Sequence, residues 1–106
     1  MIYFITNGKS VKIGYTKNNI ERRLKQLQTS CPQKLFILGW IDGDKEKEKE
    51  LHIQFSNSRI RSNGEWFNPT EDLLDYINKN NKKENTYVDF VDGVLISLLK
   101  IKKIII

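Results

Sequence analysis

The N-terminal segment of the chain has the hydrophobic pattern of two β-strands. Residues 2–5 are apolar and of β-prone types, and Asn7-Gly8 behind them is a strong signal for a tight hairpin turn. After the turn, Val11 and Ile13 fall on one face of an extended strand and Lys12 falls on the other. The pattern predicts an antiparallel hairpin with strands at residues 2–6 and 10–15.

The hydrophobic period changes twice in the next part of the chain. Ile20, Leu24 and Leu27 recur at the spacing of one helical face. They predict a helix over residues 19–28, with Asn18 or Asn19 as its N-cap. Residues 34–41 are mostly apolar and few in number, so they predict a buried strand, which the turn-forming residues 42–44 end.

Two more helices are expected in the middle of the chain. In a helix over residues 44–58, Glu48, Leu51, His52 and Phe55 would lie on one face. Since Leu51 and Phe55 should face the core, Glu48 and His52 should lie on or beside that buried face. A third helix should follow Thr70, its candidate N-cap, and residues 78–85 should form a polar loop.

These elements follow the order β-β-α-β-α-α, which predicts a small α+β fold with a three-stranded antiparallel sheet flanked by helices. We expect a domain over residues 1–80 and a C-terminal extension over residues 81–106. Residues 86–103 should regain order, with 87–91 strand-like and 94–99 open between strand and helix. The extension should pack on the domain or form an oligomer contact, so the expected state is a monomer or a homodimer. Its apolar part is interrupted by lysines and too short to span a membrane.

The net charge permits a polyanionic partner. The 106-residue chain has a net charge of +5, with seven basic residues and one acid before residue 42. Residues 42–81 instead hold nine acids and six bases. This asymmetry suits a site that binds both a polyanion and a cation, although on charge alone ordinary solvated surface is the favoured explanation. The single cysteine forms no internal disulfide and no signal peptide is visible, which favours an intracellular location.

Four short motifs resemble the GIY-YIG nuclease superfamily. They are Ile2-Tyr3-Phe4, Lys12-Ile13-Gly14-Tyr15-Thr16, Arg22 ten residues after Lys12, and Glu48-Lys49-Glu50-Leu51. Three further stretches, residues 21–28, Leu51-His52-x-x-Phe55 and Gly64-Glu65-Trp66-Phe67, resemble a branch of small proteins from phages, large DNA viruses and some fungi. The resemblance covers residues 2–77, and an asparagine-, lysine- and isoleucine-rich composition also fits a viral or phage protein.

The resemblance implies a role for each motif residue. Tyr3 would activate the nucleophile, the Lys12 ammonium would favour its phenolate, and Arg22 would bind phosphate oxygens. Glu48 would bind Mg²⁺ or Mn²⁺, and His52 would position a neighbour or transfer a proton. Each has a plainer reading as strand aromatic, surface charge or satisfied helix residue. Two positions depart from the usual pattern, because Lys12 replaces a tyrosine and Gln26 stands where other branches have a histidine.

Other residues are expected to support the site. Lys17, Arg23 and Lys25 should bind nucleic acid along the approach to the cleft. Gly14 should let the backbone come close. Glu65 should brace Arg59 or the backbone, or serve as a second metal ligand. Trp66 and Phe67 are expected in the core.

The predicted function is therefore that of a metal-dependent endonuclease or nickase. It would hydrolyse phosphodiester bonds of DNA with low sequence specificity, with RNA as an open alternative substrate. In a virus-infected cell it would act in the cytoplasm or nucleus of the host. The alternative is a non-catalytic module for nucleic-acid binding or protein interaction that retains the fold.

Overall fold

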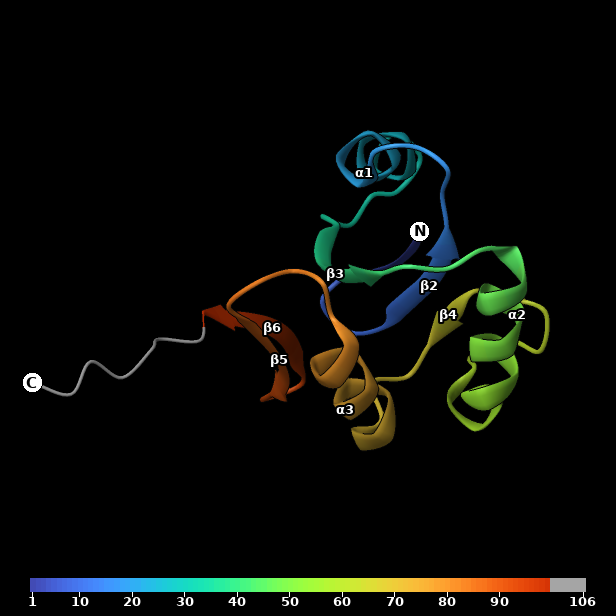
Figure 1. The fold of residues 1–106 in the computed structure, drawn as a ribbon. Helices are drawn as coiled ribbons and strands as arrows, with labels where there is room; N and C mark the ends of the chain where they lie inside the picture. Colours follow the sequence, from blue (N-terminus) through green and yellow to red (C-terminus); the bar gives the residue numbers. More distant parts are fainter. Residues whose placement is uncertain (100–106) are drawn as a thin grey trace, which may run out of the picture.

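A four-stranded antiparallel sheet forms the centre of the molecule (Figure 1). In the computed structural model, which describes residues 1–99, the strand order is β3-β1-β2-β4. The strands are β1 (Ile2–Thr6), β2 (Val11–Tyr15), β3 (Phe36–Ile41) and β4 (Trp66–Phe67). The α+β class and the antiparallel sheet predicted from the sequence are confirmed. The sheet has one strand more than expected, because a two-residue strand is too short to show a period of two.

The turn between β1 and β2 is held by its own side chains. The Asn7 Oδ1 accepts hydrogen bonds from the Lys9 and Ser10 amides, and the Thr6 hydroxyl accepts one from Gly8 N. Gly8 has φ +98°, a conformation that glycine adopts without steric cost. The predicted Asn7-Gly8 hairpin is therefore confirmed.

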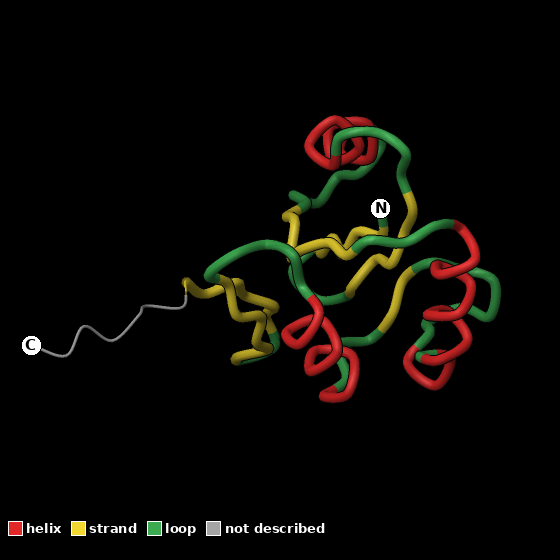
Figure 2. The backbone as a smooth tube through the Cα atoms, viewed as in Figure 1, coloured by secondary structure: helices red, strands yellow, loops and turns green. Residues whose placement is uncertain are grey.

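Three helices cover the two faces of the sheet (Figure 2). They are α1 (Ile20–Thr29), α2 (Lys45–Gln54) and α3 (Glu71–Asn80). The Asn19 side chain caps α1 by accepting from the Glu21 and Arg22 amides, as one of the two predicted caps. Helix α2 is shorter than the predicted 44–58, and a 3-10 turn, η1 (Ser56–Ser58), follows it. Serine and asparagine side chains compete for backbone hydrogen bonds, which disfavours continuing the helix there.

Two hydrophobic clusters lie on opposite faces of the sheet. The smaller cluster joins the sheet to α1 and centres on Tyr3, Ile5, Ile20 and Leu35. The larger cluster joins the sheet to α2, α3 and the C-terminal hairpin, and it includes Ile13, Leu51, Phe67, Leu73 and Leu95. The alternation along β2 therefore sends Lys12 and Gly14 to the α1 face and the apolar residues to the other.

The segment after α3 covers the free edge of β3. The Asn81 Oδ1 accepts from Trp40 N, its Nδ2 donates to Leu38 O, and Lys82 N donates to Trp40 O. A Cβ at Gly39 would collide with the Asn81 carboxamide, so a glycine is required there. The loop predicted over residues 78–85 begins later, because α3 continues to Asn80, and its first residues also protect a sheet edge.

A two-stranded hairpin, β5 (Thr86–Val91) and β6 (Val94–Leu99), follows this segment. Val88 and Leu95 are buried in the larger cluster, and Leu95 N donates to Gly8 O at 2.7 Å. The strand expected at 87–91 is confirmed. The segment 94–99, for which the sequence left strand and helix as alternatives, is a strand. The division at residue 80 stays a prediction, as does the oligomeric state, and residues 100–106 lie outside the described part. Within residues 1–99, no helix is long and apolar enough to cross a membrane.

Candidate active site

Tyr3 and Gly14 form the first part of the candidate site on the α1 face of the sheet. They are paired across β1 and β2, and Tyr3 is almost fully buried. A Cβ on Gly14 would collide with the end of the Tyr3 ring, including its hydroxyl. The group that comes close to Gly14 is therefore the side chain of Tyr3.

Lys12 lies on the same face, diagonally across from Tyr3 in the strand register. Its side chain is only 12% exposed, and Nζ is 2.8 Å from the Glu65 Oε2. Nζ also lies 5.5 Å from the centre of the Trp66 ring. Glu65 thus pairs with Lys12, and the expected brace between Glu65 and Arg59 is wrong, because the Arg59 Nε donates to Gly64 O instead.

Glu48 is the acidic member of the site and lies half-buried on α2. Burial raises the pKa of its carboxyl, and the negative charge of Glu65 raises it further, while His52, Lys12 and Lys45 act in the opposite direction. Glu48 is therefore within electrostatic reach of the Lys12–Glu65 pair. In the described part of the chain, no hydrogen bond or ion pair engages its carboxylate.

His52 connects α2 to the neighbouring elements. Its Nε2 lies 2.9 Å from the Ile13 carbonyl oxygen, and its Nδ1 lies 3.3 Å from the Arg59 Nη2. Because the carbonyl only accepts and the guanidinium only donates, the tautomer that satisfies both bonds carries its hydrogen on Nε2. These two bonds connect α2, which also carries Glu48, to β2 and to Arg59.

The two arginines of α1 lie in different environments. Arg22 is exposed, whereas Arg23 is half-buried beside the apolar stripe of the helix. The Arg23 Nη1 donates to Gln26 Oε1 at 3.3 Å, and its buried Nε has no hydrogen-bond partner among the described residues. The Arg23 side chain is therefore more enclosed than that of Arg22.

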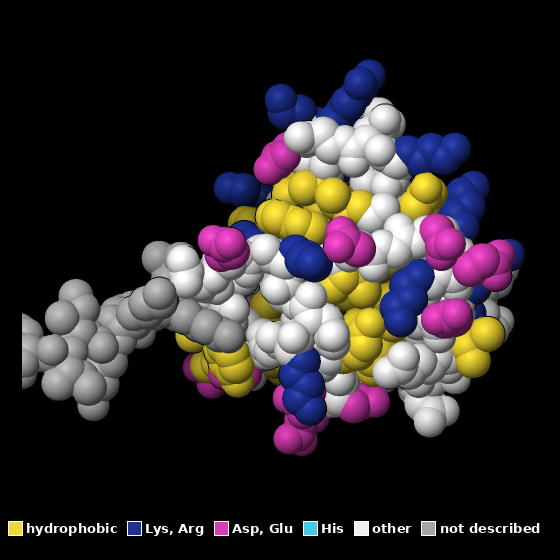
Figure 3. All heavy atoms as spheres, in the orientation of Figure 1, with side chains coloured by type: hydrophobic (Ala, Val, Ile, Leu, Met, Phe, Trp, Pro, Cys, Tyr) yellow, Lys and Arg dark blue, Asp and Glu magenta, His cyan; other side chains and the backbone are white. Residues whose placement is uncertain are grey.

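A pocket of about 260 Å³ lies between α1 and the start of α2. The structure brings Lys17 and Arg23 together there, while Lys25 is exposed and not part of its lining. Lys45, which the sequence analysis missed, adds a third cation, and its position three residues before Glu48 was the available signal. Figure 3 shows basic side chains around α1. The residues that line the pocket are Tyr15, Thr16, Lys17, Asn18, Arg23, Gln26 and Lys45.

The donor set near Glu48 fits one kind of metal. Within residues 1–99, no three His, Cys, Asp or Glu side chains form a group that could hold an ion. Mg²⁺ does not need such a group, since it often keeps several waters and takes one or two carboxylates plus substrate phosphate. A half-buried Glu48 within electrostatic reach of a second carboxylate, Glu65, is compatible with that mode of binding.

Comparison with known proteins identifies a family. The sequence model of the T5orf172 domain matches residues 1–82, which include the sheet and all three helices. This domain is phage-associated and belongs to a nuclease-related clade of GIY-YIG/HNH-like proteins, which is consistent with a nuclease-like or DNA-binding role. No curated protein and no solved structure matches the chain.

Proposed function

Because the chain belongs to the T5orf172 domain family, we propose that it is a metal-dependent endonuclease of the GIY-YIG type. It would hydrolyse phosphodiester bonds of DNA, as a nickase or a double-strand cutter, with low sequence specificity. The observation that carries the proposal is the Lys12–Glu65 ion pair, which lies beside the strand position that Gly14 leaves open for Tyr3 and within electrostatic reach of Glu48.

In this proposal, each residue of the site has a separate role. Tyr3 orients or activates the attacking water, and the Lys12 ammonium stabilises negative charge on the neighbouring oxygen atoms. The Glu65 carboxylate fixes the Lys12 side chain, so the ammonium has a defined position before substrate binds. His52 braces α2 and thereby the position of Glu48.

Phosphate binding is assigned to the cationic pocket. Arg23 lines this pocket and offers the planar donors of its guanidinium group. Lys17 and Lys45 line the same pocket and would position the backbone of the nucleic acid. Glu48 would hold Mg²⁺ or Mn²⁺, which when bound would neutralise charge on the phosphate and the leaving oxygen.

The test is cleavage of supercoiled plasmid and of a branched DNA substrate in the presence of Mg²⁺ or Mn²⁺. Glu48→Gln and Tyr3→Phe should each lower the rate by at least about 100-fold, because each removes a group that acts on the reacting atoms. Glu50→Gln is the matched control, since Glu50 is an exposed acid on the same helix.

Three other results would contradict the proposal. Equal cleavage by wild type, Glu48→Gln and Tyr3→Phe would indicate a different centre. An equal loss in Glu50→Gln would indicate a general effect of charge on α2. Salt-sensitive DNA binding without any cleavage of either substrate would favour the non-catalytic binding module.

A further inference from the structure

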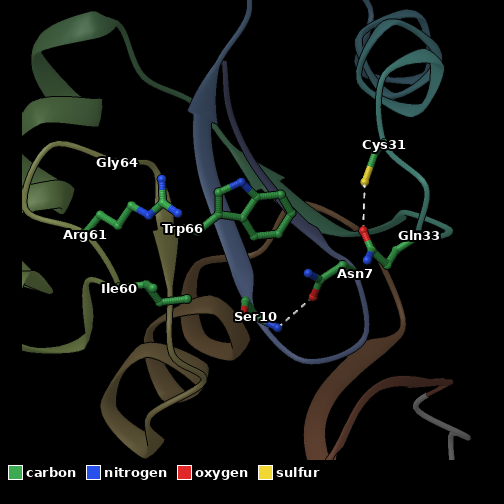
Figure 4. Close-up of a pocket in the computed structure, with 8 residues that line it drawn as sticks. All are labelled: Asn7, Ser10, Cys31, Gln33, Ile60, Arg61, Gly64 and Trp66. Carbon is green, nitrogen blue, oxygen red and sulfur yellow. Dashed lines mark hydrogen bonds between the residues drawn. The ribbon is translucent and has the colours of Figure 1, made fainter.

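A second pocket lies on the same side of the sheet as Lys12, beyond Trp66 (Figure 4). Its volume is about 430 Å³, within the usual range for sites that bind small ligands. Three segments far apart in the sequence form its walls, namely the β1–β2 turn, the loop after α1 and the loop before β4. The lining residues are Asn7, Ser10, Cys31, Gln33, Ile60, Arg61, Gly64 and Trp66.

Trp66 connects this pocket to the candidate active site. Its indole is only partly buried and forms part of the pocket lining, so an aromatic surface is available there. The Lys12 Nζ lies 5.5 Å from the centre of the same ring. A ligand that contacts the indole in the pocket is therefore next to the Lys12–Glu65 pair.

The polar groups of the pocket are mainly hydrogen-bond donors. The Asn7 Oδ1 is already occupied by two backbone amides, which leaves its Nδ2 to donate. The Gln33 Oε1 accepts a weak bond from the Cys31 thiol at 3.5 Å, which leaves its Nε2. Arg61 adds a guanidinium, and of the eight described lining residues it is the only charged one.

The walls of the pocket are held in place before any ligand binds. Gly64 N donates to Arg61 O at 3.0 Å, the Arg59 Nε donates to Gly64 O, and Ile60 N donates to Trp66 O. The Asn7 carboxamide is fixed by the turn that it caps. A preformed site of this kind orders few groups when it binds, which favours affinity.

We propose that this pocket binds one unstacked purine base next to the phosphate that is cut. Bases stack on exposed aromatic rings with little regard to sequence, and a purine offers its N7 acceptor, with O6 added in guanine, to arginine and amide donors. A base enters such a pocket only after leaving the helical stack. The chain therefore prefers nucleic acid with unpaired bases over a continuous duplex. The adjacency to the cut phosphate rests on the proposed function, whereas binding of the base does not.

The test is a binding titration in EDTA, which removes any cleavage. The probe is a single-stranded DNA heptamer with 2-aminopurine at its central position, whose fluorescence falls when the base stacks. Wild type should quench the probe and bind it more tightly than the same sequence in a duplex. Trp66→Leu should abolish the quenching and weaken binding about tenfold, and Trp66→Phe should restore most of both.

Arg61→Ala keeps the test informative if Trp66→Leu does not fold, because Arg61 is exposed. It should weaken binding of the probe more than Lys79→Ala, which removes the same charge from an exposed site on α3 outside the pocket. Unchanged quenching in Trp66→Leu, or equal effects of Arg61→Ala and Lys79→Ala, would overturn the base pocket.

The two proposals fail in different ways. Plasmid cleavage that depends on Glu48 together with a probe that is not quenched would overturn the base pocket and leave the nuclease proposal in place. Quenching that depends on Trp66 and Arg61 together with no cleavage of any substrate would support the pocket and overturn the nuclease proposal.

Discussion

At the scale of single residues, the buried ring of Tyr3 restricts which residue can stand at position 14. The Tyr3 ring occupies the space where any larger residue would place its Cβ, and that ring is enclosed in the smaller hydrophobic cluster. Interiors are close-packed, so the ring has no room to move away without disturbing other side chains.

Gly14→Ala should therefore lower the free energy of unfolding by about 1–3 kcal/mol, the usual range for overpacking. Gly64→Ala is the matched control, because a Cβ there meets its nearest neighbour, a carbon of Arg61, at 3.4 Å. Urea unfolding followed by circular dichroism measures both. Equal stability of Gly14→Ala and wild type would show that the Tyr3 ring moves aside at little cost in free energy.

Glu48 is the residue whose charge should make stability depend on pH. Its pKa is raised above the ordinary value of 4.5, first by burial and then by Glu65. Above pH 4.5 and up to the raised pKa, the folded chain holds more protons than the unfolded chain, so stability falls as pH rises. At neutral pH the whole of this cost is present.

Glu48→Gln should consequently be more stable than wild type at pH 7 when the buffer contains EDTA. The difference should shrink as the pH falls through the raised pKa toward 4.5, because the wild-type carboxyl then becomes protonated in the folded and the unfolded chain alike. Unfolding midpoints between pH 4 and pH 8 provide the measurement. A less stable variant at pH 7 would mean that the ionised carboxylate stabilises the fold through a contact.

At the scale of elements, helix α1 places its two arginines in different environments. Motif spacing favours Arg22, but the helix places Arg22 in solvent and Arg23 in the cationic pocket. A phosphate bound in that pocket would be next to the Arg23 guanidinium, which forms part of its lining.

Arg23→Ala should reduce kcat/KM for plasmid cleavage by about tenfold or more, and by clearly more than Arg22→Ala. The reason is that a charge-assisted contact inside a pocket contributes more than an exposed charge. Single-turnover cleavage at low salt measures both variants. The reverse ranking would return the phosphate-binding role to Arg22.

The C-terminal hairpin can be tested as an element of the fold. Leu95 on β6 is 5% exposed and belongs to the larger hydrophobic cluster, whereas Leu98 on the same strand is 48% exposed. Leu95→Ala should cost about 2–4 kcal/mol of unfolding free energy, and Leu98→Ala less than about 0.5 kcal/mol. Thermal or urea unfolding compares the two. Equal small losses would show that the hairpin adds little to stability.

At the scale of the whole molecule, the basic charge of the N-terminal part is combined with a lysine from the acidic middle part. Lys17 and Arg23 meet Lys45 in one pocket, although Lys45 belongs to a stretch with more acids than bases. The cationic surface is therefore a property of the fold and differs from the distribution of charge along the chain.

Lys45→Ala should weaken DNA binding at low salt and reduce the slope of log K against log salt by about 1, as expected for one lost phosphate contact. Lys49→Ala is the matched control, because Lys49 is exposed on the same helix outside the pocket lining. Fluorescence anisotropy between 50 and 200 mM salt measures both slopes. Identical slopes for the two variants would contradict the assigned surface.

The main elements were predictable because each has a local physical cause. The Asn7-Gly8 turn, the stripe of Ile20, Leu24 and Leu27, and the Asn19 cap act within a few residues, and the structure contains all three. The end of α2 was placed four residues too late, since apolar spacing up to Phe55 outweighed the capping preference of residues 56–58. The strand β4 was missed because two residues carry no period.

The sequence by itself determined the order of the first three strands and the three α-helices, most residues that face the core and the set of motif residues, because short-range spacing and side-chain type are sufficient for these. Only the tertiary structure decided that Glu65 pairs with Lys12, that His52 bonds Ile13 and Arg59, and that Arg23 lies in a pocket with Lys45. These contacts join residues that are distant in the chain, and their geometry depends on how the helices pack on the sheet.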